Sequence, residues 1–347
     1  MSTPTIPAGN LFMNATTYTG TGASQTVVNG VAGQSFQPDF IWAKNRSSAA
    51  NHYDIDSVRG AGQALYPNLT NAEGTDTNTI SAFLSNGFNI NGASTILNTS
   101  GSNYVAWQWK AGGTAVSNTA GTITSQVSAN TTSGFSVVTY TGTGSAATVG
   151  HGLGVAPAMI IVKSRSNGGT YYDWPVYHTG LGGNTKTMWL NLTNTVGTYP
   201  SYWNSTSPTS SVFSLGNDIT VNQSSATYVA YCWTPIAGYS AFGSYTGNGS
   251  SDGPFVYLGF RPRFIMFQCT TAGSNWTIVD TARSTYNVAT LTLLPNDSRA
   301  ENSYANYDFL SNGFKIRGSQ VNEYNVSGQT YIYAAFAENP FKYANAR

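Results

Sequence analysis

The same series of short motifs occurs three times, in the same order, along the chain. Each copy opens with a hexapeptide, which reads TYTGTG at 17–22, TYTGTG at 139–144 and SYTGNG at 244–249. A proline-led apolar segment follows, then a segment such as FLSNGF. The copies close with YVAWQWK from Tyr104, YVAYCWT from Tyr228 and YIYAAFA from Tyr331. Successive copies start roughly 100 residues apart, which matches a whole domain and is too long for a solenoid repeat or a propeller blade. The chain is therefore expected to contain three related domains.

Within each copy the apolar segments have the length and composition of β-strands. They run for 5 to 8 residues, are rich in β-branched and aromatic side chains, and are separated by Asn-Gly, Ser-Gly and Gly-Gly steps. No stretch has a helical period of apolar residues, and the nearest candidates, 56–64 and 280–286, would form only one or two turns. The sequence predicts an all-β protein of three tandem β-sandwich (jelly-roll-like) domains related by internal repeat.

The motif positions also predict domain boundaries. Residues 15–112, 135–240 and 241–347 are expected to form the three sandwiches. Residues 113–134 contain small and polar residues with few apolar ones, so they are interpreted as a linker or arm. Residues 1–14 precede the first copy and are expected to form an N-terminal docking segment that contacts a partner chain.

The composition excludes several classes of protein. Only 8% of the residues are charged, against roughly 25% in an average soluble domain. The net charge is +1 and no basic stripe is present, so nucleic acid is not an expected partner. No apolar run is long enough to span a membrane, and the first 15 residues lack the basic and apolar regions of a signal peptide, so secretion by that route is not expected. Cys232 and Cys269 lie in apolar strand-like runs, which predicts buried free thiols.

Motifs of catalytic or cofactor sites are weak or missing. The hexapeptide lacks the third glycine of a dinucleotide fingerprint and the Gly-Lys-Ser/Thr ending of a phosphate loop, so it is interpreted as a strand followed by a glycine turn. DSVRG at 56–60 and DTARS at 280–284 are interpreted as local Asp–Arg pairs. Asp54 and Asp56 form the one tight carboxylate pair, which keeps a glycan depolymerase open as a remote alternative. No cofactor, metal site or enzymatic activity is predicted.

Two stretches combine aromatic and polar side chains at high density, GGTYYDWPVYH from Gly168 and YPSYWNSTSP from Tyr199. Exposed aromatic rings stack on the apolar faces of sugars, while amides and hydroxyls bind sugar hydroxyls. These stretches are therefore candidates for surface recognition, with packing in a core as the alternative. The candidate residues are Tyr171, Tyr172, Trp174, Tyr177, Tyr199, Tyr202 and Trp203.

Longer motifs carry a resemblance to a known class of proteins. PDFIWAKNR at 38–46, DSVRG at 56–60, YVAWQWKAGG at 104–113 and the terminal YIYAAFAENPFKYANAR at 331–347 resemble segments of proteins encoded by tailed bacteriophages of the marine type. The resemblance runs from about Thr17 to Arg347, and its terminal signature is the most specific part. Such proteins are described as virion structural or tail-fibre-like proteins.

The resemblance implies a phage virion structural protein, expected to be a tail-fibre-like or receptor-binding component that contacts the host surface. A capsid or tail decoration protein that stabilises the particle is the alternative. The implied partners are further copies of the chain in a trimer or other symmetric homo-oligomer, other virion proteins through the N-terminus, and a host surface glycan or protein. The protein is expected to be made in the host cytoplasm and to reside in the virion. The resemblance transfers no catalytic residues.

Overall fold

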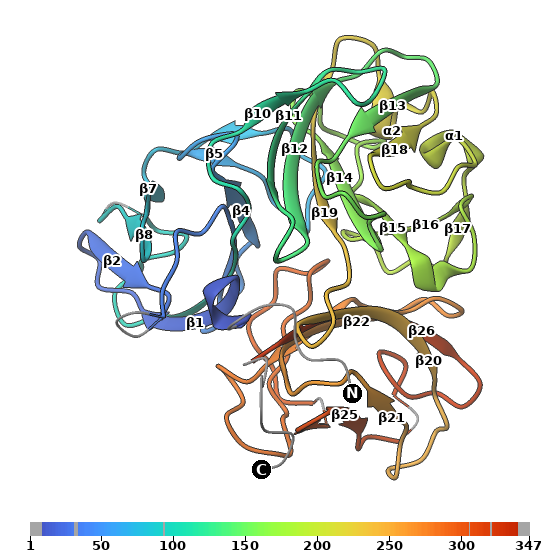
Figure 1. Cartoon of the computed structure of the whole chain (residues 1–347). Helices are drawn as coiled ribbons and strands as arrows, with labels where there is room; N and C mark the ends of the chain where they lie inside the picture. Colours follow the sequence, from blue (N-terminus) through green and yellow to red (C-terminus); the bar gives the residue numbers. More distant parts are fainter. Residues whose placement is uncertain (1–8, 31–33, 93, 305, 320, 339–347) are drawn as a thin grey trace.

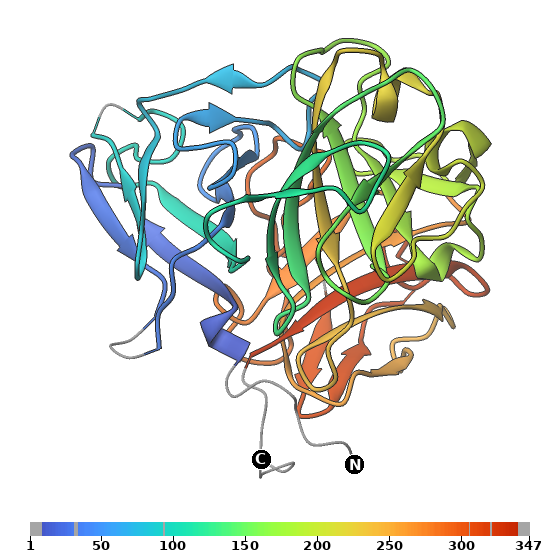
Figure 2. The same ribbon diagram turned by 45° about the horizontal axis from the view of Figure 1, so that its top comes forward.

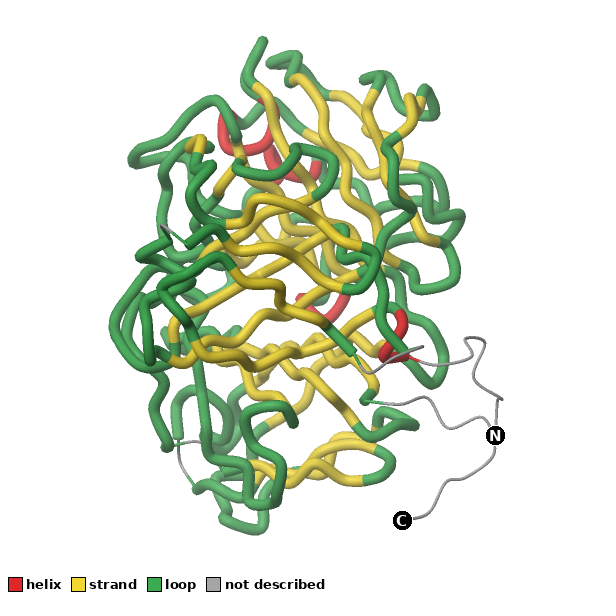
Figure 3. The backbone as a smooth tube through the Cα atoms, turned by 90° about the vertical axis from the view of Figure 1, so that its left-hand side faces the viewer, coloured by secondary structure: helices red, strands yellow, loops and turns green. Residues whose placement is uncertain are grey.

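In the computed structural model the regular secondary structure is almost all β-strand, joined by loops, as Figure 3 shows, and the strands pair antiparallel; this confirms the prediction of an all-β protein. The structure describes residues 9–30, 34–92, 94–304, 306–319 and 321–338. Within them, helical structure is confined to single turns. These turns are η1 (Gly9–Leu11), η2 (Thr179–Leu181), α1 (Pro200–Trp203) and α2 (Ile219–Asn222). None of the described helices has the length and apolar character that crossing a membrane requires.

The first part of the chain forms two sheets that face each other. One sheet has the strand order β1-β9-β3-β4 and the other has the order β2-β8-β7. An apolar cluster that includes Ile41, Tyr53 and Phe88 fills the space between them. The strands are β1 (Met13–Thr19), β2 (Gln25–Val28), β3 (Phe40–Asn45), β4 (Tyr53–Asp56), β7 (Ile80–Leu84), β8 (Gly87–Ile90) and β9 (Asn103–Trp109), with a short β5 (Gln63–Ala64) and β6 (Gly74–Thr75) pair beside them.

The second part contains the same four-strand order, β12-β19-β14-β15, inside an eight-stranded sheet. Strands β16 and β17 extend this sheet at one end, and β11 and β10 extend it at the other. A two-stranded sheet, β13-β18, covers its outer face. The strands are β10 (Val116–Asn118), β11 (Ser125–Asn130), β12 (Phe135–Thr141), β13 (Ala147–Gly150), β14 (Met159–Ser164), β15 (Pro175–His178), β16 (Lys186–Trp189), β17 (Gly197–Thr198), β18 (Val212–Leu215) and β19 (Thr227–Trp233).

The third part repeats the arrangement of the first, with sheets in the orders β20-β26-β22-β23 and β21-β25-β24. We call the parts unit 1 (β1 to β9), unit 2 (β10 to β19) and unit 3 (β20 to β26). The exact domain limits within the chain stay a prediction. The strands of unit 3 are β20 (Ser240–Thr246), β21 (Phe255–Tyr257), β22 (Pro262–Cys269), β23 (Thr277–Asp280), β24 (Tyr307–Leu310), β25 (Gly313–Ile316) and β26 (Thr330–Ala337).

The segment interpreted as a linker, residues 113–134, is folded, which corrects that interpretation. Its strand β11 pairs with β12 from Gln126 opposite Thr139 to Asn130 opposite Phe135, and β10 pairs with β11. Few apolar residues are needed because β11 lies near the margin of the sheet and buries mainly small side chains such as Ser128. Of the predicted docking segment 1–14, residues 1–8 lie outside the described residues, and β1 already begins at Met13.

Each hexapeptide forms a strand end and a turn that one asparagine holds in place. In unit 1 the ring of Tyr18 stacks on Tyr104 with 5.1 Å between centroids, and its hydroxyl donates to the carbonyl of Leu97. The amide of Thr21 donates to Asn98 Oδ1 at 3.0 Å. The same contacts recur between Tyr140 and Tyr228, Thr143 and Asn222, Tyr245 and Tyr331, and Asn248 and Asn325. The three hexapeptides therefore have a structural role.

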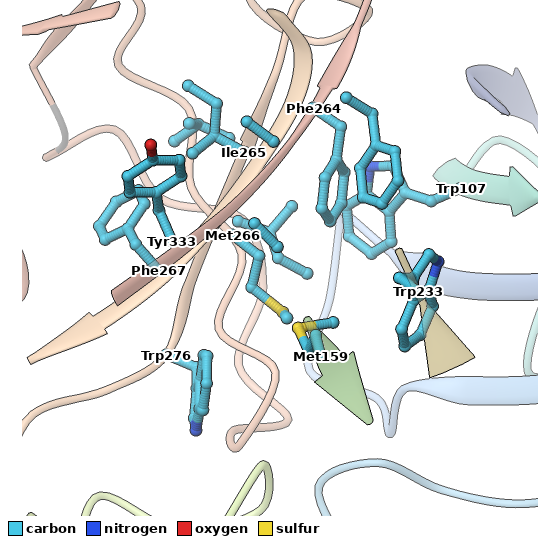
Figure 4. Packing of buried hydrophobic residues seen from close by; sticks show 14 of the residues in the cluster. Trp107, Met159, Trp233, Phe264, Ile265, Met266, Phe267, Trp276 and Tyr333 are labelled. Carbon is cyan, nitrogen blue, oxygen red and sulfur yellow. The ribbon is translucent and has the colours of Figure 1, made fainter. Parts of the chain in front are cut away.

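The three units surround a common centre, as Figures 1 and 2 show. Their four-stranded sheets contribute to one apolar cluster, in which Trp109 of unit 1 lies 6.1 Å from Trp233 of unit 2 and 5.6 Å from Phe336 of unit 3 between ring centroids. Figure 4 shows Met159 of unit 2 beside Met266 of unit 3 in this cluster. The units therefore share a core that none of them completes alone.

Equivalent hydrogen bonds join the units in a closed ring. At each junction a backbone amide of one unit donates to a carbonyl of the next unit. The acceptor is the residue that directly follows β14, β22 or β3. The donor and acceptor pairs are Glu73 and Arg165, Val196 and Thr270, and Glu301 and Arg46, at 2.8 to 3.0 Å. One chain thus contains three similar units and three similar junctions, and the relative positions of the units are fixed by direct bonds.

Candidate functional site

Unit 2 differs from the other two units in its outer layer, and its exposed aromatic side chains lie there. In units 1 and 3 the outer sheet includes a strand, β7 or β24, that forms a hairpin with the strand after it, β8 or β25. In unit 2 the outer sheet is the β13-β18 pair, and α1 precedes β18 in place of that strand. Tyr171 is 69% exposed, Tyr199 is 41% exposed and Ile219, the first residue of α2, is 40% exposed. We call the surface formed by Tyr171, Tyr172, Tyr199 and Ile219 the tyrosine surface; Tyr202 lies buried beneath it.

A buried threonine connects the two stretches that the sequence singled out. Thr220 of α2 donates its hydroxyl to the carbonyl of Tyr171 at 3.0 Å and lies 3.4 Å from the hydroxyl of Tyr202. Tyr199 stacks on Tyr202 with 5.0 Å between centroids, and Trp189 packs against Tyr199 edge-on at 5.2 Å. The tyrosine surface is therefore supported by side-chain contacts from three segments of unit 2.

The α2 turn of the tyrosine surface is held by its N-cap residue and by the side-chain amide of the glutamine that follows it. Asp218 is the N-cap of α2 and its carboxylate accepts from the amide of Thr220 at 2.9 Å. Gln223, which follows α2, accepts from the hydroxyl of Tyr172 at 2.7 Å. Burial raises the pKa of Tyr202, so its hydroxyl remains a protonated hydrogen-bond donor at neutral pH.

A buried lysine, Lys163, forms a hydrogen bond to the loop that carries Tyr171 and Tyr172. Lys163 Nζ donates to the carbonyl of Tyr172 at 2.8 Å and to the carbonyl of Thr70 in unit 1 at 3.2 Å. Burial lowers the pKa of Lys163 to about 7. The indole of Trp174 donates to the carbonyl of Leu69 at 2.9 Å. The tyrosine surface is thus attached to unit 1 as well as to its own sheet.

The seven predicted recognition residues divide into two groups. Tyr171 and Tyr199 are exposed and Tyr172 is partly exposed, so these three remain candidates. The other four are buried, which corrects the prediction for them: they are Trp174, Tyr177, Tyr202 and Trp203. Tyr177 lies on β15, an inner strand with neighbours on both sides, and Trp203 packs in the core of unit 2. Composition alone does not separate these residues from exposed ones.

The sequence analysis did not identify the residues in and next to α2, Asp218, Ile219, Thr220 and Gln223, as part of a site. An aspartate placed two residues before a threonine is a usable N-cap signal. The helix is only one turn long, however, so the periodicity of apolar residues cannot reveal it.

The two Asp-x-x-Arg motifs lie at the junctions between units. Arg59 Nε lies 2.5 Å from Asp56 Oδ2, and the hydroxyl of Tyr231 in unit 2 donates to the same oxygen at 2.9 Å. Arg283 binds Asp280 in the same way, and there the indole of Trp107 in unit 1 is the donor at 2.9 Å. Both pairs are fully buried. They fix turns, as predicted, and they also connect units.

The equivalent place at the third junction has His178, which bonds the carbonyl of Tyr333 in unit 3 through Nε2 at 3.0 Å. Burial lowers its pKa to about 4, so the ring is neutral at pH 7. Asp54, the other half of the candidate carboxylate pair, is buried, and burial raises its pKa. Since neither Asp54 nor Asp56 is more than 1% exposed, these carboxylates cannot flank a bound sugar in this conformation.

Side chains suited to metals do not gather in the part of the chain that the structure describes, where no group of three or more His, Cys, Asp or Glu residues has the geometry to hold an ion. Cys232 and Cys269 are buried free thiols, in agreement with the sequence-based prediction.

Comparison with known proteins identifies a family without assigning an activity. A family model described as "Domain of unknown function (DUF7483)" matches residues 8–340. No curated protein matches the chain. Because the match includes all three units and nearly the whole sequence, the chain belongs to the DUF7483 family.

Proposed function

We propose that this protein is a structural component of a phage virion, of the tail-fibre-like kind, and that it binds saccharides of the host surface through the tyrosine surface. The observation that carries the binding role is the exposure of Tyr171 and Tyr199 on a support of buried hydrogen bonds and ring contacts. The phage origin rests on the sequence resemblance. A homo-oligomer of this chain is a further expectation from that resemblance.

The chemistry of the tyrosine surface suits neutral sugars. Phenol rings provide flat apolar area for the carbon faces of a sugar ring, and their hydroxyls provide hydrogen-bond partners. The ring of Tyr199 is held by stacking on Tyr202 and by Trp189, so little conformational entropy is lost when a ligand stacks on it.

The electrostatics of the chain point in the same direction. With 8% charged residues and a net charge of +1, the surface attracts neither strongly acidic nor strongly basic partners at long range. Binding through rings and hydroxyls is expected to depend weakly on salt, because no counterions are released.

A glycan array and a cell-adsorption assay with purified protein test this proposal. Wild-type protein is expected to bind a defined group of glycans, and Tyr171→Ala and Tyr199→Ala are expected to weaken binding by about tenfold each, the effect of losing one well-packed ring contact. Tyr286→Ala is the matched control, since Tyr286 is 85% exposed on unit 3.

Absence of binding to glycans and to host cells would overturn the proposal. Equal loss of binding in the Tyr286→Ala control would also contradict it, because the effect would then not belong to the tyrosine surface. Intact adsorption of virions that lack the protein, together with lower particle stability, would favour the decoration role instead.

A further inference from the structure

The first strand of the four-strand order in each unit (β1, β12 and β20) has one side that faces away from the other three strands, and the three units differ in what covers this side. In unit 2 the edge of β12 is paired with β11. In unit 3 the edge strand β20 is contacted by η2, where Gly180 lies against the carbonyl of Gly243. In unit 1, within the described residues, β1 pairs with β9 alone.

The hydrogen-bond pattern of β1 identifies the backbone groups at its open edge. The backbone amide of Lys110 donates to the carbonyl of Phe12, and the backbone amide of Gly20 donates to the carbonyl of Ser102. The backbone groups of the even-numbered residues of β1 therefore bond β9. The amides and carbonyls of Ala15 and Thr17 therefore point to the open edge. The carbonyl of Ala15 accepts from Arg263 Nη2 at 2.7 Å, while the backbone groups of Thr17 have no partner among the described residues.

A groove of about 510 Å³ runs along this edge, between unit 1 and unit 3. Its volume lies within the range of sites that hold a ligand. Amide and hydroxyl side chains dominate its lining, among them Asn14, Thr16 and Thr281. The charged side chains that line it, Arg263 and Glu338, lie 3.4 Å apart and neutralise each other. The groove thus combines the backbone groups of Thr17, which have no partner among the described residues, with a lining of no net charge.

We propose that this groove binds an extended, uncharged strand of another polypeptide, which adds to β1 in the antiparallel direction. Unit 2 contains the equivalent complex within the chain, because the hexapeptide positions align Thr17 with Thr139 and Ala15 with Val137. There, β11 places Gln126 opposite Thr139 and Ser128 opposite Val137. Strand addition of this kind obtains its affinity from main-chain hydrogen bonds and its specificity from alternate side chains.

The chemistry of the bound strand follows from the groove and from β11. The sequence of β11, Ser-Gln-Val-Ser-Ala-Asn, has no charge. On β1 the groove is lined by Asn14 and Thr16, at the positions that Ser136 and Val138 occupy in unit 2. The partner strand is therefore expected to present polar amides or hydroxyls to this side. A second copy of the chain does not offer β11 for this purpose, because that strand is already paired with its own β12.

Fluorescence anisotropy with a labelled peptide, Thr-Ser-Gln-Val-Ser-Ala-Asn-Thr (residues 124–131), tests the proposal on the full chain. Wild-type protein is expected to bind the peptide saturably. Thr17→Pro removes the outward amide without removing a bond to β9, so it is expected to weaken binding by about tenfold. Thr19→Pro is the matched control and is expected to bind like wild type, because the equivalent Thr141 has no partner on β11.

Three results would overturn the proposal. The first is lack of saturable binding at peptide concentrations up to about 1 mM. The second is equal affinity of the Thr17→Pro and Thr19→Pro variants when both have the thermal stability of folded protein. The third is a peptide-free wild-type dimer that Thr17→Pro converts to monomer, because the occupant of the groove would then be a second copy of the chain. None of these results depends on glycan binding by the tyrosine surface.

Discussion

The hydroxyl of Tyr231 in unit 2 donates to the buried carboxylate of Asp56 in unit 1 at 2.9 Å. The side chain of Arg59 also binds this carboxylate, and its Nη2 donates to the hydroxyl of Tyr231 at 3.1 Å. The three side chains form a closed set of charge-assisted hydrogen bonds between two units. Because they are buried, removing one member leaves the others without full hydrogen bonding.

We expect Tyr231→Phe to lower the free energy of unfolding by about 1–3 kcal/mol, the cost of leaving buried polar groups unsatisfied. Chemical denaturation monitored by circular dichroism measures this change. Tyr171→Phe is the control, since the hydroxyl of Tyr171 is on an exposed side chain, and it is expected to unfold like wild type. A Tyr231→Phe variant as stable as wild type would show that this contact does not stabilise the junction.

The second prediction concerns the glycine that follows each hexapeptide strand. A Cβ at Gly142 would lie 2.3 Å from the carbonyl oxygen of Gln223, and the same 2.3 Å separation applies at Gly20 and Gly247. Gly142→Ala is therefore expected to destabilise the protein by about 1–3 kcal/mol through overpacking against the backbone. Gly74→Ala is the matched control because a Cβ there meets nothing within 4 Å. Thermal unfolding compares the two, and equal melting temperatures would contradict the prediction.

The repeat made much of this architecture predictable from the sequence. Three copies of the same motifs indicated all-β structure and a structural role for Tyr18 and its equivalents, because a turn that recurs with the same glycines has one backbone geometry. The closed ring could not be predicted, since its bonds join Tyr231 to Asp56 and Trp107 to Asp280, residues more than 170 positions apart.

The candidate site was predicted less completely than the fold. Tyr171 and Trp174 lie three residues apart in one aromatic stretch, yet the first is exposed and the second is buried under unit 1. Packing between units decides which ring is exposed, and one sequence without its tertiary contacts contains no signal for that choice.

The third prediction concerns acid stability at the junction of units 2 and 3. Burial lowers the pKa of His178 to about 4, against about 6.5 for an exposed histidine. The unfolded chain therefore binds a proton between these values while the folded protein does not, so the contribution of His178 is present above pH 6.5 and is lost as the pH falls toward 4. This contribution amounts to about 3 kcal/mol over the whole interval.

Denaturation at a series of pH values compares wild type with His178→Gln, whose side chain does not titrate. We expect the difference in free energy of unfolding between the two proteins to change by about 3 kcal/mol between pH 7 and pH 4, with wild type losing stability relative to the variant. A constant difference across this range would show that the imidazole of His178 titrates alike in the folded and unfolded chains.

The last prediction separates support of the tyrosine surface from overall stability. Thr220→Val keeps the shape of the side chain but removes the hydroxyl that bonds the carbonyl of Tyr171 and approaches Tyr202. If the proposed glycan binding is correct, the loop that carries Tyr171 becomes less ordered, and affinity falls by about three- to tenfold. The matched control is Thr187→Val, which removes a buried hydroxyl that bonds the carbonyl of Val176 on β15 and not a residue of the tyrosine surface. Both variants are expected to lose a similar amount of stability, of about 1 kcal/mol, but Thr187→Val is expected to keep the wild-type affinity. Glycan affinity and melting temperature are measured for both variants. Equal losses of affinity would contradict the prediction, because glycan binding would then follow the overall stability of the protein and not the contact of Thr220 with the tyrosine surface.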